Sequence, residues 1–409
     1  MHISTGDTTF MMLCTAMVCL MTPGLAFFYG GLSRSKNVLL IMMESFISMG
    51  IVTLIWIFGG FGLAFGRDVH GIIGMPTDYF ALHNVSLVPN AVHAASIPFA
   101  LFFLFQLMFC VITVPLITGA FAQRLNVKGY VLMLVFWTIL VYLPVCHWVW
   151  GNGFLAKMGF VDFAGGTVIH TTAGFAALAS IAVLGKRQLK ERSMKPSNLM
   201  AAAIGTGLLW FGWFGFNSGG ALKAGLLATT AFMNTIVGLA SGMVVWLIYA
   251  KVVHGRVSFV DVLTGSVAGL ATITPCAGYI KPTMAIVVGI VAGIVCNVAV
   301  SIQEKLGWDD ALGVWGVHGM GGFTGTILIG ILASKTINGV AAGWHQFMVQ
   351  VGGVILVAVY AFVITWIIVK VLAMITDIKP TKEQVKEGLD KVLLDEATYD
   401  LNSLKGGEK

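Results

Sequence analysis

Charged side chains are scarce in this sequence, because Asp, Glu, Lys and Arg together make up only 10% of its 409 residues. An ordinary soluble domain carries about 25% charged residues. Hydrophobic residues reach 57% before the 50 glycines are counted, so the charges are too few to cover a soluble core of that size. A cytosolic enzyme, a nucleic-acid-binding protein and a secreted disulfide scaffold are all poor explanations. The composition indicates an integral membrane protein.

Paired cysteine motifs are also absent. No two of the six cysteines have the CxxC spacing, and all six lie in or beside apolar runs. This pattern favours buried thiols over disulfides or a zinc site, so we expect no metal and no cofactor. The first six residues contain no Lys or Arg and lack the basic region of a cleavable signal. We therefore expect the first apolar run to be a true membrane span.

Long apolar runs recur along the whole chain. A helix needs about 20 mostly apolar residues to cross a bilayer. Eleven runs approach or exceed that length, at 9–31, 38–65, 98–122, 129–150, 165–185, 198–218, 226–250, 258–280, 283–302, 311–333 and 346–374. The sequence therefore predicts an all-α integral membrane protein with eleven transmembrane helices.

Basic residues are distributed unevenly between alternate loops. The loops after odd-numbered runs hold twelve Lys and Arg residues: Arg34, Lys36, Arg124, Lys128, Lys186, Arg187, Lys190, Arg192, Lys195, Lys251, Arg256 and Lys305. The loops after even-numbered runs hold five: Arg67, Lys157, Lys223, Lys281 and Lys335. Because cytoplasmic loops carry the excess of Lys and Arg, we predict that the N-terminus lies outside and the C-terminus lies in the cytoplasm.

Eleven spans fit two inverted five-helix halves, at about 1–190 and 198–340, plus a last helix at about 346–374. Residues 1–374 would then form the membrane domain and 375–409 a cytoplasmic tail. In the fifth run, His170 directly follows the stretch Gly-Gly-Thr-Val-Ile. In the tenth run, His318 directly follows the stretch Gly-Val-Trp-Gly-Val. Inverted repeats place a substrate path where the halves meet, so we expect the two histidines near that path.

Ionisable side chains inside a span by default mark a pathway or a proton relay. The alternative for His170 and His318 is that each forms a hydrogen bond to a neighbouring helix and only holds the bundle together. Asp162 lies eight residues before His170 and is expected to cap the helix start, while its charge also favours a nearby cation. Aromatic residues near the outer span ends are either interface anchors or a cage for a small cation.

Five motifs in this order resemble the ammonium transporter family (Amt/Mep/Rh), on its Amt branch. These motifs are Met-Thr-Pro-Gly-Leu-Ala-Phe-Phe-Tyr-Gly-Gly over 21–31, Asp-Phe-Ala-Gly-Gly over 162–166 with His170, Gly-Trp-Phe-Gly-Phe-Asn over 212–217, Thr-Pro at 274–275 with Gly-Tyr at 278–279, and Gly-Val-His-Gly over 316–319. The resemblance covers nearly the whole chain.

The resemblance implies a homotrimer in the plasma membrane, with one hydrophobic pore in each subunit. It implies an outer ammonium site of Phe105 and Trp150 supported by Asp162. It implies a gate formed by Phe105 and Phe216, and a pore lined by His170, His318 and Trp213. A regulatory tail and a PII-type partner at the cytoplasmic face are also implied, with Gly388, Leu389, Asp390 and Tyr399 as the tail residues.

Four departures from the family pattern affect these expectations. Gly220 stands where the Amt branch usually has a Ser that binds the outer ammonium, and Ser218 lies about 200° away around a helix. Gly313 and Trp315 stand where many members have Asp and Phe. Glu44 stands where many members have Gln. In the tail, Leu394 and Asp395 stand where the family usually has His-Gly. Outer ammonium binding is therefore expected to be weaker, and regulation through the tail stays open.

Ammonium transport is the leading hypothesis, in which NH4+ loses a proton at the outer site and NH3 crosses the pore. An ammonium sensor on the same scaffold is the alternative, although the chain after Lys379 is too short for an independent signalling domain. A metalloenzyme with His170 and His318 as ligands lacks a nearby carboxylate or thiolate. A potassium channel would need a Thr-Val-Gly-Tyr-Gly-like filter, which this sequence does not contain.

Overall fold

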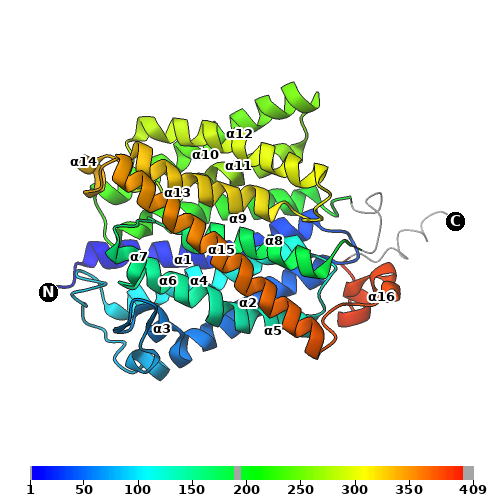
Figure 1. Cartoon of the computed structure of the whole chain (residues 1–409), viewed down its shortest axis with the longest axis horizontal. Coiled ribbons are helices and arrows are strands. Elements are labelled where there is room, and N and C mark those ends of the chain that lie inside the picture. The colour runs from blue at the N-terminus through cyan, green and yellow to red at the C-terminus, as the bar shows by residue number, and fades with distance from the viewer. Residues whose placement is uncertain (1, 188–194, 399–409) are drawn as a thin grey trace.

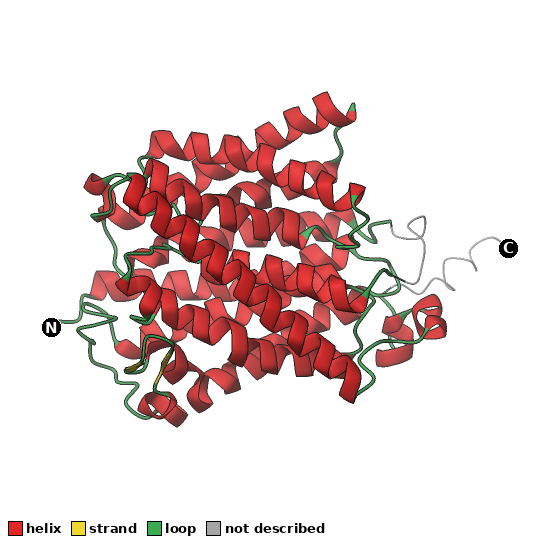
Figure 2. Ribbon diagram, viewed as in Figure 1, coloured by secondary structure: helices red, strands yellow, loops and turns green. Residues whose placement is uncertain are grey.

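The computed structural model describes residues 2–187 and 195–398, and most of that chain is helical (Figure 2). The α-helices of the N-terminal half are α1 (Thr5–Leu32), α2 (Val38–Ile55), α3 (Phe61–Phe65), α4 (Phe99–Phe121), α5 (Val127–Trp137), α6 (Leu143–Trp150), α7 (Phe154–Lys157) and α8 (Thr172–Leu184). Those of the rest are α9 (Leu199–Ser218), α10 (Leu226–His254), α11 (Phe259–Ile273), α12 (Pro282–Lys305), α13 (Met320–Leu332), α14 (Lys335–Asn338), α15 (Trp344–Ile375) and α16 (Lys382–Glu387).

Shorter elements interrupt or flank these helices. The π-helical segments are η1 (Trp56–Gly60), η3 (Thr138–Tyr142), η4 (Gly166–Thr171), η7 (Trp315–Gly319) and η8 (Asp390–Leu394). The 3-10 segments are η2 (Pro76–Leu82) and η6 (Gly219–Ala221). One antiparallel hairpin, β1 (Asp68–Val69) and β2 (Ile73–Gly74), pairs Asp68 with Gly74 in the loop between α3 and α4.

Most of the predicted membrane spans form helices of the required length. Within the described ranges, ten continuous helical stretches are long and apolar enough to cross a bilayer. The run expected over 258–280 appears as α11 (Phe259–Ile273), which has 15 residues and is shorter than the ~20 that a span usually needs. The all-α membrane fold is therefore confirmed, while the count of eleven spans stays a prediction.

The helices pack side by side in one bundle (Figure 1). The start of α1 and the tail helix α16 lie at opposite ends of this bundle, as an odd number of spans requires. Which end faces the cytoplasm stays a prediction.

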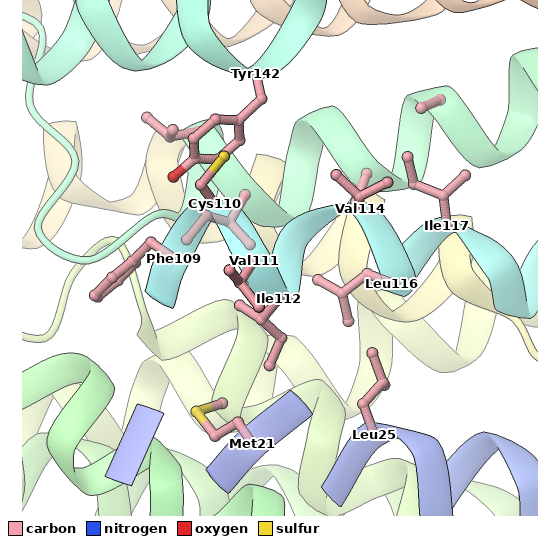
Figure 3. Packing of buried hydrophobic residues seen from close by; sticks show 14 of the residues in the cluster. Met21, Leu25, Phe109, Cys110, Val111, Ile112, Val114, Leu116, Ile117 and Tyr142 are labelled. Atoms are coloured by element: carbon pink, nitrogen blue, oxygen red, sulfur yellow. The ribbon is translucent and has the colours of Figure 1, made fainter. Parts of the chain in front are cut away.

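The centre of the bundle is formed by α4, since 83% of its most apolar window is buried, against 28% for α10. Figure 3 shows side chains of α1 and α4 facing each other there, with Met21 and Leu25 opposite Ile112 and Leu116. A helix that is apolar on every side belongs in a core or in lipid. The exposed apolar face of α10 therefore suits lipid or another protein chain.

Candidate functional site

The two span histidines meet in the middle of the bundle. His170 lies on η4 and His318 on η7, both are buried, and their Nδ1 atoms are 3.2 Å apart. The rings are nearly parallel, with centroids 5.2 Å apart. One Nδ1 must donate and the other accept, because a neutral imidazole has one N–H and one lone pair. The neighbouring helix that each histidine reaches is thus the one that carries the other histidine.

Glycines allow the two histidine-bearing helices to come this close. A Cβ on Gly174 of α8 would lie 2.1 Å from the Cα of Gly319. A Cβ on Gly322 of α13 would lie 2.1 Å from the carbonyl oxygen of Gly166 and 2.7 Å from the Cβ of His170. Gly174 lies against Gly319, and Gly166 lies against Gly322. The residue number rises along one helix while it falls along the other, so the two helices cross in antiparallel orientation. This arrangement agrees with the opposite orientation predicted for the two halves.

Asp162 caps the segment that carries His170. Its carboxylate accepts four backbone N–H groups, from Gly165, Gly166, Thr167 and Val168, at 2.7–3.1 Å. These donors would otherwise be unsatisfied at a helix start. The backbone carbonyl of Asp162 also accepts the indole N–H of Trp150 at 2.8 Å. The capping role expected from the sequence is thus present, and the same residue positions Trp150.

Asp310 plays the matching role before His318, and the sequence analysis missed it. Its carboxylate accepts the backbone N–H of Trp315 at 2.8 Å, at the start of η7. The signal was available, since 170 − 162 and 318 − 310 both equal eight residues. The repeated Asp-x7-His spacing is better support for two related halves than the two histidines alone.

Trp213 lies beside the histidine pair, as expected. Its ring stacks on His170 at a centroid distance of 5.3 Å, and its indole N–H donates to the hydroxyl of Thr274 at 2.8 Å.

A narrow cavity of about 10 Å³ adjoins these rings. This is close to the smallest space that admits one molecule of the size of water. Its lining is Met21, Leu25, Phe28, Ile112, Leu116, Ile169, His170, Leu209, Trp213, Phe216, Val267 and His318. Part of this lining is visible in Figure 3, where Met21 and Ile112 point toward each other. The buried Nε2 of His170 makes no hydrogen bond within the described ranges, so a small polar molecule in the cavity would find an unused partner.

The aromatic gate requires a correction. The ring that lies against Phe216 is that of Phe109 rather than Phe105, at a centroid distance of 4.4 Å and with the two planes tilted by 31°. Phe109 also contacts the edge of Trp150, at 6.0 Å. Phe105 packs behind, against Phe109 at 4.8 Å. Phe105 and Phe109 are one helical turn apart on the same face of α4, so the position of α4 along its own axis decides which ring reaches Phe216.

The region where a Ser was expected is tightly packed. A Cβ on Gly220 would lie 2.8 Å from the carbonyl oxygen of Phe163 and 3.1 Å from its ring. A Ser at 220 would therefore have to displace Phe163. Ser218 is buried, and its hydroxyl forms no hydrogen bond within the described part of the chain.

Glu44 is buried in α2, and no ion pair among the described residues joins it to Arg34 or Lys36. Arg34 instead donates to the carbonyl of Val385 in the tail, at 2.9 Å. In residues 2–187 and 195–398, no three His, Cys, Asp or Glu residues gather in a group that could hold a metal ion.

The tail docks on the first turn of α2. The carboxylate of Asp390 accepts the backbone N–H groups of Leu39 and Leu40, at 3.1 and 2.9 Å. The N–H of Leu389 donates to the side chain of Asn37, the residue that precedes α2. The tail therefore supplies the helix cap that Asn37 does not provide for α2 itself.

Gly388 allows this close approach. It has a φ of +122°, and a Cβ there would lie 2.7 Å from the side chain of Lys36. A residue with a side chain would be strained and would clash. Three of the four predicted tail residues thus lie at one contact with the membrane domain, and Tyr399 lies outside the described residues.

The comparisons with known proteins agree with this geometry. The model of the Ammonium Transporter Family matches residues 9–399. A relative named ammonium transporter, from Bacillus subtilis, is 39% identical over 405 residues, covering 96% of this chain and 98% of that protein. The crystal structure of Candida albicans Mep2 is similar with a TM-score of 0.87 at 32% identity, covering 93% of this chain and 88% of that one. A structure titled Sensor Amt Protein gives a TM-score of 0.87 at 30% identity, with 94% and 97% covered. The chain therefore belongs to the Ammonium Transporter Family.

Proposed function

We propose that this protein carries ammonium across a membrane by binding NH4+ at an outer aromatic site and conducting NH3 past His170 and His318, while the proton removed from NH4+ either stays in the outer water or is carried across separately. The observation that carries this proposal is the pair of hydrogen-bonded imidazoles beside a small, otherwise apolar cavity. A cavity of about 10 Å³ suits a molecule of the size of water or NH3. A bare ion placed there would lose its hydration without a matching set of ligands.

The chemistry of the walls favours a substrate that can shed its charge. Ammonium and potassium ions are similar in size, so a cage of fixed size separates them poorly. Only ammonium can release a proton and continue as a small neutral molecule. Phe109, Trp150 and Phe216 form the aromatic group that would attract the cation, since each good contact with an aromatic face contributes about 0.5–2 kcal/mol.

The histidine pair gives the neutral molecule partners of both kinds. If the Nδ1 atoms share one proton and both rings are neutral, then one Nε2 is a donor and the other an acceptor. Ammonia donates and accepts hydrogen bonds, so it fits between them. Trp213 stacks against His170 and closes the apolar wall.

Electrical recording on a solid-supported membrane tests this function. We expect ammonium pulses to give uptake or current in the wild-type protein and potassium pulses to give none. His170→Ala and His318→Ala should abolish transport or admit potassium. His345→Ala, at an exposed position on α15, is the matched control and should behave as wild type. Unchanged selectivity and rate in both pore variants would contradict the proposal.

The alternative function is ammonium sensing, and the similarity to the structure titled Sensor Amt Protein keeps it open. A sensor would bind ammonium and change its tail without moving substrate. Ammonium pulses that alter protease cleavage of the tail but give neither current nor uptake would favour this alternative.

We also propose that the protein forms a homotrimer in the plasma membrane, with the N-terminus outside and the tail in the cytoplasm. The exposed apolar residues of α10, such as Phe232, Met233 and Ile248, support a face that is covered by another subunit or by lipid. Docking of the tail on α2 supports regulation at that end by a PII-type protein. Native mass spectrometry of the detergent-solubilised protein, alone and with a PII protein, tests both points.

A further inference from the structure

His147 is a completely buried histidine to which the sequence analysis gave no role. It lies on α6, three residues before Trp150. Its Nδ1 is 2.9 Å from the carbonyl oxygen of Ala64 at the end of α3, and its Nε2 is 2.9 Å from Oδ1 of Asp68 on β1. Its side chain therefore joins α6 to the hairpin loop of residues 66–75.

The hydrogen-bond partners of His147 fix its protons. A carbonyl oxygen only accepts, so Nδ1 must carry a hydrogen. An ionised carboxylate also only accepts, so Nε2 must carry one as well. A neutral imidazole has a single N–H. Either His147 is an imidazolium facing a carboxylate, or the proton belongs to Asp68.

The surroundings of Asp68 decide between these two states. Lys157 forms an ion pair with its second oxygen, and the backbone N–H of Gly71 donates to Oδ1 at 2.8 Å. Hydrogen bonds from His147 and Lys157 lower the pKa of Asp68 to about 2. Asp68 is therefore a carboxylate, and both ring nitrogens of His147 face oxygen atoms that only accept.

Other ionisable groups around His147 do not supply a competing proton acceptor. Burial, and more weakly the charge of His147, lower the pKa of His93 to about 4, so His93 is neutral. Neither α3 nor β2 contains an ionisable side chain. The segments η3 and η4 pack against α6 and carry Tyr142 and His170, of which His170 bonds to His318.

His147 also holds the chain that follows Trp150. Its backbone carbonyl accepts the N–H groups of Gly151 and Gly153, both at 3.0 Å. On the same helix, Trp148 donates its indole N–H to the carbonyl of Ile72 in the hairpin loop, at 2.8 Å. The outer end of α6 is thus fixed to the hairpin loop on one side, while the indole of Trp150 is fixed to Asp162 on the other.

We propose that His147 is a positioning residue for the outer ammonium site, which it holds in shape as an imidazolium paired with Asp68. The inference rests on the proposed function, because Trp150 is the aromatic residue that it positions. Loss of the proton from His147 leaves a lone pair facing a carboxylate. One of the two bonds then breaks, and the outer end of α6 is less firmly held.

The variant Asp68→Asn separates this role from ordinary structural support. An Asn at 68 can turn either its oxygen or its NH2 group toward Nε2, so the hydrogen bond survives with a charged or a neutral ring. The matched control is Asp78→Asn, which removes a carboxylate on η2 that pairs with Arg67 of the hairpin loop, at 2.8 Å.

The assay is the apparent KM for ammonium between about pH 5 and 8, the range in which histidine changes charge. In wild type and Asp78→Asn we expect KM to rise with pH by about threefold to tenfold, the effect of one net hydrogen bond. In Asp68→Asn the profile should be flat. The same profile in wild type and Asp68→Asn would overturn the proposal.

A measurement that needs no transport keeps the two proposals apart. At about pH 5, nitrogen NMR of protein labelled with [15N]histidine should show a ring with two N–H groups that is absent in His147→Gln. A wild-type His147 with a single N–H at that pH overturns the proposal even if Asp68→Asn does not fold. If the protein does not transport ammonium but His147 is an imidazolium, the proposed function is wrong and the charge state of His147 still holds. The positioning role is then wrong as well, because it rests on the proposed function.

Discussion

The crossing of α8 and α13 gives the sharpest prediction, which concerns Gly174→Ala. The new Cβ would lie 2.1 Å from the Cα of Gly319. Unbonded carbons approach to about 3.5 Å at best, so the helices must separate by about 3.5 − 2.1 = 1.4 Å. The Nδ1 atoms of His170 and His318, now 3.2 Å apart, would move toward about 4.6 Å. That is well beyond a hydrogen bond.

Overpacking of this kind costs about 1–3 kcal/mol, which a membrane domain of this size can tolerate while still folding. We therefore expect Gly174→Ala to be expressed, to melt at a lower temperature, and to lose most ammonium current. Gly319→Ala should be milder, since its Cβ would lie 3.1 Å from the Cα of Gly174. Gly207→Ala, on α9 with open space around it, controls for a glycine change within a helix. A Gly174→Ala protein with the stability and current of Gly207→Ala would refute the reasoning.

Three further predictions follow from the carboxylates. Asp162→Ala removes the acceptor of four backbone N–H groups. It should lower the free energy of unfolding by about 2–6 kcal/mol, at about 0.5–1.5 kcal/mol per hydrogen bond. Thermal unfolding measures this loss, which should be smaller for Asp162→Asn. Asp390→Ala uncaps α2 and should release the tail, seen as faster protease cleavage after residue 375. Burial alone would raise the pKa of Asp309, but hydrogen bonds and charge from Arg187, with the charge of Arg124, lower it overall. Asp309 therefore stabilises the fold above its unfolded pKa of about 3.9 and loses this effect as the pH falls below it, so the melting temperature of Asp309→Asn should respond less to acid than that of wild type.

Sequence reasoning located the spans and the two histidines inside them because both depend on local composition. Apolar runs must cross the bilayer, and a histidine inside one is costly enough to require a reason. The same reasoning found that Asp162 begins a helix, since a carboxylate before a glycine-containing start is a common cap.

The choice between Phe105 and Phe109 depended on something that the sequence does not contain. Both residues lie on one face of α4, and the position of that helix along its own axis brings Phe109 against Phe216. The bond between His147 and Asp68 joins residues 79 positions apart, so no local pattern indicates it. Asp310 is different, because its spacing to His318 repeats that of Asp162 to His170 and was available from the start.

The pseudo-symmetry of the site explains why its parts must change together. Each half contributes a carboxylate cap, a π-helical segment and a histidine to one antiparallel crossing. A π-helical turn inserts an extra residue into the helical repeat, so it turns each histidine relative to the helix that follows. If one half lost its π-turn, its histidine would rotate away from the partner, and the other half could not compensate. The contact between the histidines therefore depends on how the two helices cross. A variant such as Gly174→Ala, which preserves each helix but alters the crossing, tests the site more directly than His170→Ala, which removes a ring.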